Sequence, residues 1–367
     1  MGNFDDLDLA VASFGASNKV IYDDVEKPSI MVAVPKMTYA DLITGGTQDV
    51  LPWWTVDGVE LDQIWVSKYQ NIVMNDRAYS LPAKDPKTWI NFDQALAACR
   101  KKGKGWHLNQ NGVFACLNLL AQKNNCIPRG NTNWDKSYEA GYERGVNTYI
   151  DGNHKGGRTA TGTGPKTWYT DYDTSGIADL CGNVWEWVSG MRIVNGEIQI
   201  IPTGSAIKLD CNMGANSTEW KAIKPDGSVV EPGTEGTLHY NVVSGKIVID
   251  TKTDSTTSNN IAFNDLAAAS GVQIPQLAIA AGVIKDSASV WAAPGHRQYL
   301  NTEGERLPFR GSSFNGPSYG GVASLFLYNS RTASNNCIGF RSAYVELETG
   351  NGKTGKAAEA DGKETAE

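Results

Sequence analysis

The chain has 367 residues, of which 41% are hydrophobic and 20% charged, close to ordinary globular proteins and unlike disordered or collagen-like chains. Its 33 basic and 40 acidic residues give a net charge of −7, which argues against a nucleic-acid-binding surface. The combination of 39 glycines with 11 tryptophans predicts a loop-rich backbone held by large aromatic anchors.

The first part of the chain has the clearest helix signals. Residues 1–60 predict a small strand-rich N-terminal segment, and residues 65–73 have a β-rich composition. Asn91 can cap a helix whose apolar residues at 92, 95, 96 and 99 follow helical spacing and which ends at Gly103. A second helix is predicted after GWHL, with the apolar positions from 113 to 121 on one face.

The rest of the chain predicts loops and hairpins. Residues 128–165 are polar and glycine-rich, and we expect Trp134 and Tyr138 to hold this long loop in place. Asn195-Gly196 between two apolar runs is a strong hairpin signal. A helical stretch is expected near 263–283, interrupted at Pro275. The charged segment 346–367 has no aromatic residue and predicts disorder.

The sequence carries no sign of export. The acidic start MGNFDDLDLAVASFG lacks the basic and apolar regions of a secretory leader, and no window approaches 18 consecutive apolar residues. The six cysteines are widely spaced and form no CxxC pair, so we expect reduced, buried thiols rather than zinc ligands or disulfides. We therefore expect synthesis in a cytoplasm.

The candidate catalytic motifs depart from the patterns that their chemistry requires. GGRTATGTGPKT has Pro165 where a phosphate-binding loop needs the glycine before Lys-Ser/Thr, so a flexible loop is the better interpretation. None of the four histidines has HExxH spacing, and His107, between Trp106 and Leu108, reads as a core imidazole. We expect a protein that is not an enzyme.

The segment from Ala323 to Ser330 alternates with period two. One face carries Ala323, Leu325 and Leu327, which suit a core. The other face mixes Phe326 and Tyr328 with serines, a composition that suits a recognition surface and equally a strand buried on both faces. The flanks SSFNGPSYGG and TASNNC are small, polar and turn-rich, which favours an exposed binding face.

Four blocks in order, GWHL, GNVWEW, RGSSF and IGFR, resemble the formylglycine-generating-enzyme (sulfatase-modifying factor) branch of the C-type lectin-like fold. The resemblance covers about residues 64–345. It implies an α+β, loop-rich C-type lectin-like domain over 61–345, with a hairpin-containing insertion at about 191–300. The enzymes use paired cysteines between the last two blocks. Because Cys337 stands alone there, the resemblance does not imply oxidase activity.

The chain also resembles the phage-borne variable proteins of diversity-generating retroelements, in SKYQNIV, RAYSLP, PRGN, RTATGTGP and GFRSAY. In that family a C-terminal segment, here about 306–344, is rewritten at adenine-bearing codons. The positions that match the rewritten ones, and so the implied ligand-binding residues, are Ser313, Phe314, Asn315, Gly316, Tyr319, Phe326, Tyr328, Asn329, Ala333, Asn335, Asn336 and Cys337. The implied scaffold residues are Trp106, Asn183, Trp185, Glu186, Trp187, Arg310, Gly311, Gly339, Phe340 and Arg341.

The resemblance implies a receptor-binding variable protein in a phage tail or fibre, made in the bacterial cytoplasm and displayed on the virion. Its partners would be a host cell-surface protein or glycan and other virion proteins, with no nucleic-acid or membrane partner. Homo-oligomers are compatible with this role, and residues 1–60 are a candidate attachment segment. The alternatives are a divergent formylglycine-type oxidase or related iron oxygenase, and a ligand-free structural virion protein.

The resemblance also suggests roles for four residues of the GNVWEW block. Trp185 and Trp187 are expected to anchor the sheet from behind the binding face. Asn183 and Glu186 are expected to bind neighbouring loop amides or, alternatively, a calcium ion, since carboxylate and carbonyl oxygens suit calcium. Two residues do not make a calcium site, so hydrogen bonding is the favoured role and no cofactor is expected.

Overall fold

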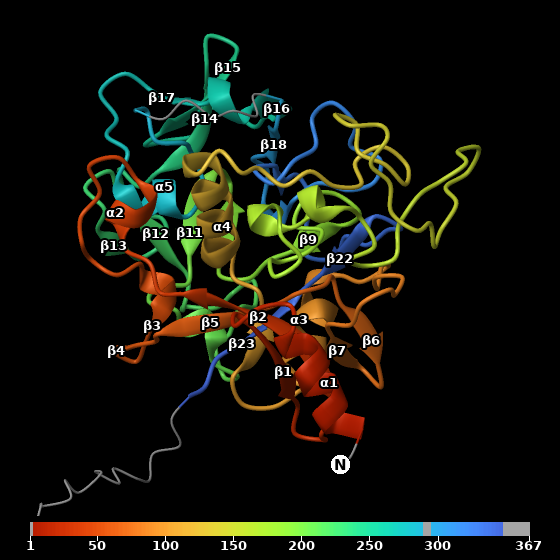
Figure 1. Ribbon diagram of the computed structural model, residues 1–367. Helices are drawn as coiled ribbons and strands as arrows, with labels where there is room; N and C mark the ends of the chain where they lie inside the picture. The colour runs from red at the N-terminus through yellow and green to blue at the C-terminus, as the bar shows by residue number, and fades with distance from the viewer. Residues whose placement is uncertain (1–2, 289–294, 348–367) are drawn as a thin grey trace, which may run out of the picture.

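Strands dominate the computed structural model, which describes residues 3–288 and 295–347. Three larger sheets and a few short helices make an α+β fold. In Figure 1 the sheet containing β2, β5 and β23 lies at the bottom and the strands β14, β15 and β17 lie at the top, with helix α4 between them. Within the described residues, no helix is long and apolar enough to span a bilayer.

The first sheet joins the two ends of the described chain. Its strand order is β1 (Asn18–Tyr22), β2 (Pro28–Pro35), β5 (Gln63–Ser67), β23 (Ser342–Tyr344) and β8 (Trp106–Leu108). β2 pairs with β5 over five residues, so the strands of segment 1–60 are built into the same sheet as the rest. Helix α1 (Asn3–Ala12) packs beside β1. The segment's role in attachment stays a prediction.

Two helices form where the sequence predicts them. α3 (Phe92–Arg100) begins after Asn91. The Asn91 side chain accepts from the Gln94 backbone amide, and the Gln94 side chain accepts from the Asn91 backbone amide, which makes a complete capping box. α4 (Asn111–Lys123) is buried on nearly every side rather than on one face, because sheets and loops surround it. The predicted strand 65–73 is split into β5 and β6 (Ile72–Met74), which pairs with β7 (Arg77–Tyr79).

The second sheet brings together strands from segment 191–300 and from the C-terminal region. Its order is β16 (Ser258–Ala262), β18 (Arg297–Asn301), β21 (Leu325–Leu327), β20 (Phe309–Arg310), β9 (Trp185–Trp187) and β22 (Ile338–Phe340). β18 pairs in parallel with β21 and antiparallel with β16. Two strands of segment 191–300 therefore complete the sheet that holds the C-terminal blocks.

The third sheet consists mostly of the remainder of segment 191–300. It contains β10 (Met191–Val194), β11 (Glu197–Ile200), β12 (Lys221–Ile223), β13 (Val229–Val230), β14 (His239–Val243), β15 (Lys246–Asp250), β17 (Ala267–Ala268) and β19 (Glu305–Arg306). The predicted hairpin is confirmed: β10 and β11 flank Asn195 and Gly196, both with positive φ. β3 (Thr55–Val56) and β4 (Val59–Glu60) form a separate small hairpin.

The predicted helical stretch over 263–283, interrupted at Pro275, is confirmed only in part. It contains only the 3-10 turn η5 (Phe263–Asp265) and the short helix α5 (Gln276–Ala280), which starts directly after Pro275. Proline has no backbone N–H and therefore fits a helix start rather than its interior. The other short helices are α2 (Tyr39–Leu42), η1 (Pro52–Trp54), η2 (Lys166–Trp168), η3 (Thr170–Tyr172) and η4 (Ser205–Ile207).

The long loop occurs as expected, between α4 and η2, and forms the irregular segments on the right of Figure 1. Trp134 anchors it by stacking on His154 at 3.9 Å between ring centres. Tyr138 is half exposed and is not such an anchor, which corrects the prediction. The predicted disordered segment 346–367 lies outside the described residues except for its first two positions.

Candidate ligand-binding site

An aromatic face runs across the second sheet. Backbone pairing places Asn260 opposite Tyr299, Tyr299 opposite Phe326, Phe326 opposite Phe309, and Phe309 opposite Trp187. Directly paired residues project to the same side of a sheet, so these five side chains share one face. The ring centres of Tyr299 and Phe326 are 5.0 Å apart, and those of Phe309 and Phe326 5.5 Å.

The opposite face of the sheet packs into the protein. Leu300, Leu325 and Leu327 are fully buried there. The Arg310 guanidinium donates to Asn111 Oδ1 at 2.9 Å and to the Ala281 carbonyl at 2.9 Å, and burial lowers the pKa of Arg310 to about 10. The period-two prediction for this strand is confirmed in its main feature, because the leucines face inward while Phe326 and Tyr328 face outward.

A pocket of about 670 Å³ opens on the aromatic face. Small-molecule sites typically measure about 300–1,000 Å³, so its size suits a ligand. Eight of the twelve residues predicted to bind a ligand line it: Ser313, Asn315, Gly316, Tyr319, Phe326, Asn329, Asn335 and Cys337. Residues separated by up to 24 positions in the sequence therefore meet around one cavity. That they bind a ligand stays a prediction.

The other four predicted residues lie outside the pocket lining. Tyr328 is 41% exposed, and its hydroxyl accepts a hydrogen bond from Ser258 at the edge of the sheet. Asn336 donates to the Tyr149 hydroxyl and to Asp151 of the long loop, while Ala333 packs against a core cluster. Phe314 is fully buried, which contradicts its assignment to a ligand-facing position.

Burial of Phe314 has a clear cause. The carbonyl of Phe314 accepts from the Trp134 amide at 2.7 Å, and its own amide donates to the Asn183 carbonyl at 3.0 Å. These bonds fix the backbone between the long loop and the scaffold, and the ring contacts Tyr149 edge-on at 6.1 Å. The side chain therefore fills the space beneath the pocket wall.

Four pocket residues come from outside the C-terminal region, and the sequence analysis missed three of them as possible ligand contacts. Asn260 lies on β16, and Arg297 and Tyr299 lie on β18. In the structure Arg297, Tyr299 and Asn301 alternate with the more buried Gln298 and Leu300 along the strand. Nothing in the sequence indicated that this strand pairs with β21.

The two tryptophans of GNVWEW lie on the pocket side of the sheet, not behind it. Trp185 lines the pocket, 5.3 Å from Phe326 between ring centres. Trp187 is fully buried beside Phe309 on the same face, and its indole N–H donates to the Ile90 carbonyl at 3.0 Å. The expectation of a rear anchor is wrong because Trp187 pairs with Phe309 of the pocket side, and Trp185, two residues away on the same strand, projects to the same face.

Local hydrogen bonds fix the pocket rim. The Ser313 hydroxyl donates to Asn315 Oδ1 at 2.8 Å, and Asn335 Oδ1 accepts from the Cys337 amide at 2.9 Å. Burial raises the pKa of the Cys337 thiol, so it stays protonated near neutral pH and is a poor nucleophile.

Ion pairs of Arg331 hold the loop that carries the pocket residues Asn329 and Asn335. Arg331 Nε and Nη2 both lie 2.8 Å from the Glu305 carboxylate, and Arg331 Nη1 lies 2.8 Å from Asp93. Arg192 also contacts Glu305. Burial opposes ionisation of Glu305, but the hydrogen bonds from the two arginines outweigh it and lower the pKa of this carboxyl.

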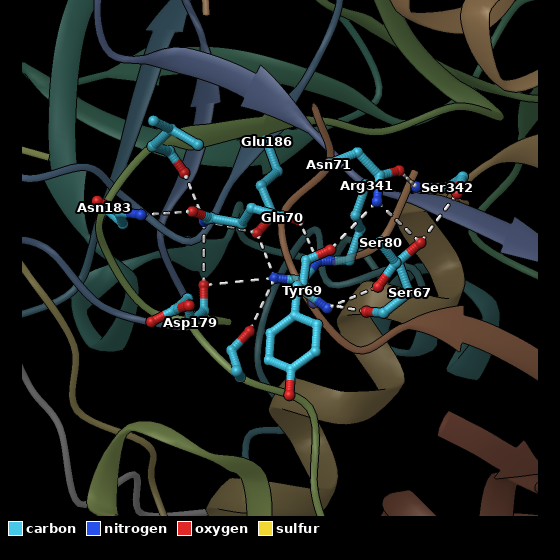
Figure 2. Close-up of polar contacts among 12 residues, drawn as sticks. Ser67, Tyr69, Gln70, Asn71, Ser80, Asp179, Asn183, Glu186, Arg341 and Ser342 are labelled. Carbon is cyan, nitrogen blue, oxygen red and sulfur yellow. Dashed lines mark hydrogen bonds and ion pairs between the residues drawn. The ribbon is translucent and has the colours of Figure 1, made fainter. Parts of the chain in front are cut away.

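A buried polar network supports the sheet from below (Figure 2). Glu186 forms a two-bond pair with Arg341, each bond 2.6 Å long, and the two side chains are almost completely inaccessible. Gln70 Nε2 donates to Glu186 at 3.0 Å and Gln70 Oε1 accepts from Asn183 at 2.9 Å. The network connects β9 and the residue between β22 and β23 to the chain following β5.

The donor set of Asn183 and Glu186 does not fit a calcium site. Both Glu186 oxygens face the Arg341 guanidinium, whose positive charge repels a cation. Asn183 Oδ1 accepts from the Thr159 amide at 2.8 Å. The arrangement matches the hydrogen-bonding alternative.

The remaining scaffold residues are tightly packed. Trp106 and Phe340 are buried, and the Lys102 ammonium lies 3.1 Å from the centre of the Trp106 ring. Gly311 has φ +85°, and a Cβ there would lie 2.6 Å from the Leu180 carbonyl oxygen. A Cβ on Gly339 would lie 2.7 Å from the Lys87 carbonyl oxygen, so both positions require glycine.

Comparison with known proteins finds distant structural similarity at low sequence identity. No family model matches the chain, and no curated protein matches it. Among solved structures, it is similar to PvdO from Pseudomonas aeruginosa, with 12% identity and a TM-score of 0.36 over 90% of this chain and 99% of that one. It is also similar to the U1 and P3c variants of Major Tropism Determinant, each with 12% identity and a TM-score of 0.28 over 90% of this chain and 67% of theirs. These identities are too low to transfer a function to this chain.

Proposed function

We propose that this chain is a receptor-binding variable protein with a C-type lectin-like fold, displayed on a phage tail or fibre. One observation carries the proposal: the pocket is lined mainly by residues that match the rewritten positions of the retroelement family. The sequence blocks GNVWEW and IGFR, which suggest the fold, form adjacent strands beneath it.

Separation of the ligand face from the scaffold supports this role. The Glu186–Arg341 pair lies outside the pocket lining, and Arg310 projects to the opposite face. Substitutions at exposed positions such as Tyr319 then change the ligand while leaving these buried bonds intact. A protein that changes its receptor repeatedly needs this independence.

The chemistry of the pocket supports binding rather than turnover. Among the described residues, its lining includes no carboxylate, histidine or lysine, and Cys337 is a buried, protonated thiol. Tyrosine, tryptophan, asparagine, serine and glycine dominate instead, as they do in antibody-type binding surfaces. We propose a host cell-surface molecule as the ligand and other virion proteins as structural partners, with affinity raised by many copies on one particle.

Two matched libraries test the proposal. One randomises five pocket or rim positions, and the other randomises five exposed positions on the third sheet and its neighbouring turns. The pocket library covers Asn315, Tyr319, Phe326, Tyr328 and Asn329, and the control library covers Val229, Glu235, Val243, Lys246 and Thr256.

Both libraries are selected for binding to a panel of bacterial cells. We expect both to keep the parental unfolding midpoint and only the pocket library to yield binders. General unfolding of the pocket library, or equal enrichment from the control library, would contradict the proposal. Enrichment of neither library would favour the ligand-free structural role.

A further inference from the structure

The pocket is built from two parts with different origins. One part, including Tyr319 and Phe326, comes from the C-terminal region that the proposed function makes variable. The other part lies before that region begins: Asn260, Arg297 and Tyr299 on β16 and β18, together with Trp185 on β9. If the proposed function holds, this second part, here called the constant half, is present in every variant and limits which ligands all variants can accept.

Arg297 gives the constant half its charge. Its Nη1 donates to Asn260 Oδ1 at 2.6 Å, which orients the guanidinium at the pocket wall. Within the described residues Arg297 has no ion pair with a carboxylate, whereas Arg158, Arg192 and Arg331 each have one. It is also the only charged residue among the described residues that line the pocket. The pocket therefore presents a positive charge without an internal counter-charge.

The rest of the lining matches a polyhydroxylated ring. Four asparagines, at 260, 315, 329 and 335, offer amides that both donate and accept, as sugar hydroxyls do. Tyr299 and Phe326 are only partly buried, with ring centres 5.0 Å apart and ring planes 31° apart, and form an apolar platform between these amides. A pyranose has an apolar C–H face and a polar hydroxyl edge, which suits such a platform.

We propose that the constant half binds the carboxylate of an acidic saccharide, with Arg297 as the carboxylate anchor and Tyr299 as part of the stacking surface. This inference rests on the proposed function and specifies its ligand class. A volume of small-ligand size favours a terminal sugar over the larger surface of a folded protein. The C-terminal part of the lining, which the proposed function makes variable, then selects the sugars that follow the acidic unit.

The test uses the full chain and isothermal titration calorimetry. The probes are oligosaccharides ending in a uronic or a sialic acid, the same oligosaccharides with the carboxyl group reduced to an alcohol, and acidic peptides. The variants are Arg297→Gln, Arg297→Lys and the control Lys246→Gln, whose residue is exposed at a hairpin turn of the third sheet. Arg297→Gln and Lys246→Gln change the net charge equally, so long-range electrostatics are matched.

We expect at least one acidic probe to bind more tightly than its reduced counterpart. Arg297→Gln should weaken that binding by about tenfold to a hundredfold, the range for a lost charge-assisted hydrogen bond. Arg297→Lys should be intermediate because lysine keeps the charge and loses the planar fork. Lys246→Gln should bind like the parent protein.

Three results would overturn the inference: equal binding of acidic and reduced probes, equal affinity of Arg297→Gln and Lys246→Gln, or no saccharide binding. Binding of acidic peptides alone, with loss in Arg297→Gln, would assign the anchor to a protein receptor instead. Failure here is distinguishable from failure of the proposed function. Cell-binding clones from the pocket library that do not require Arg297 would keep the receptor role and remove only the acidic saccharide.

Discussion

Replacing Glu186 by glutamine should destabilise the whole domain. The substitution keeps the shape of the side chain but removes the charge opposite Arg341, which is fully buried. It also turns one acceptor into an N–H₂ group that faces a donor, either the Arg341 guanidinium or Gln70 Nε2. Removing one partner of a buried ion pair typically costs about 3–5 kcal/mol.

That loss is measurable by urea denaturation and by melting. An unfolding entropy of about 2.1 cal/mol/K per residue over this chain length converts about 3–5 kcal/mol into a fall of about 4–6 °C in Tm. The matched control is Asp76→Asn, which breaks an exposed pair with Lys101 at 3.0 Å and should cost less than about 1 kcal/mol. Equal losses in the two variants would refute the structural role assigned to the Glu186–Arg341 pair.

Three further outcomes are expected. Phe314→Ala should lower the free energy of unfolding, measured in urea, by about 3–5 kcal/mol because its ring is fully buried. Tyr319 is 38% exposed, so Tyr319→Ala should lower it by less than about 1 kcal/mol, and similar losses in the two variants would contradict this contrast. Burial lowers the pKa of His107 from 6.5 to about 4, so as the pH falls the unfolded chain binds a proton before the folded chain does, and the free energy of unfolding falls through this window. His107→Gln should reduce that pH-dependent loss of stability between pH 7 and 4.5. An unchanged pH profile of stability would exclude this role for His107. In natural populations of this gene, substitutions should concentrate at pocket codons within 313–337, spare Phe314, and accompany a nearby repeat and reverse-transcriptase gene; uniform variation would remove the retroelement assignment.

Sequence alone determined the elements whose cause is local. Asn91 and Gln94 complete a capping box within four residues, and Asn195-Gly196 adopts the positive φ angles that a tight hairpin needs. Alternation from Ala323 to Tyr328 likewise separated the inward leucines from the outward aromatic residues. These features follow from hydrogen bonds and side-chain directions among near neighbours, so the chain order contains them.

Tertiary structure decided which of these elements meet. The pairing of β18 with β21 brings Arg297 and Tyr299 into a pocket whose other lining residues lie mostly after position 306. The tertiary structure also buried Phe314 and put Trp185 on the pocket side of the sheet. Strand pairing depends on backbone hydrogen bonds between residues far apart in the chain, which almost any side chain accommodates. For that reason the sequence specified the local faces, while the partners across the sheet became visible only in the folded molecule.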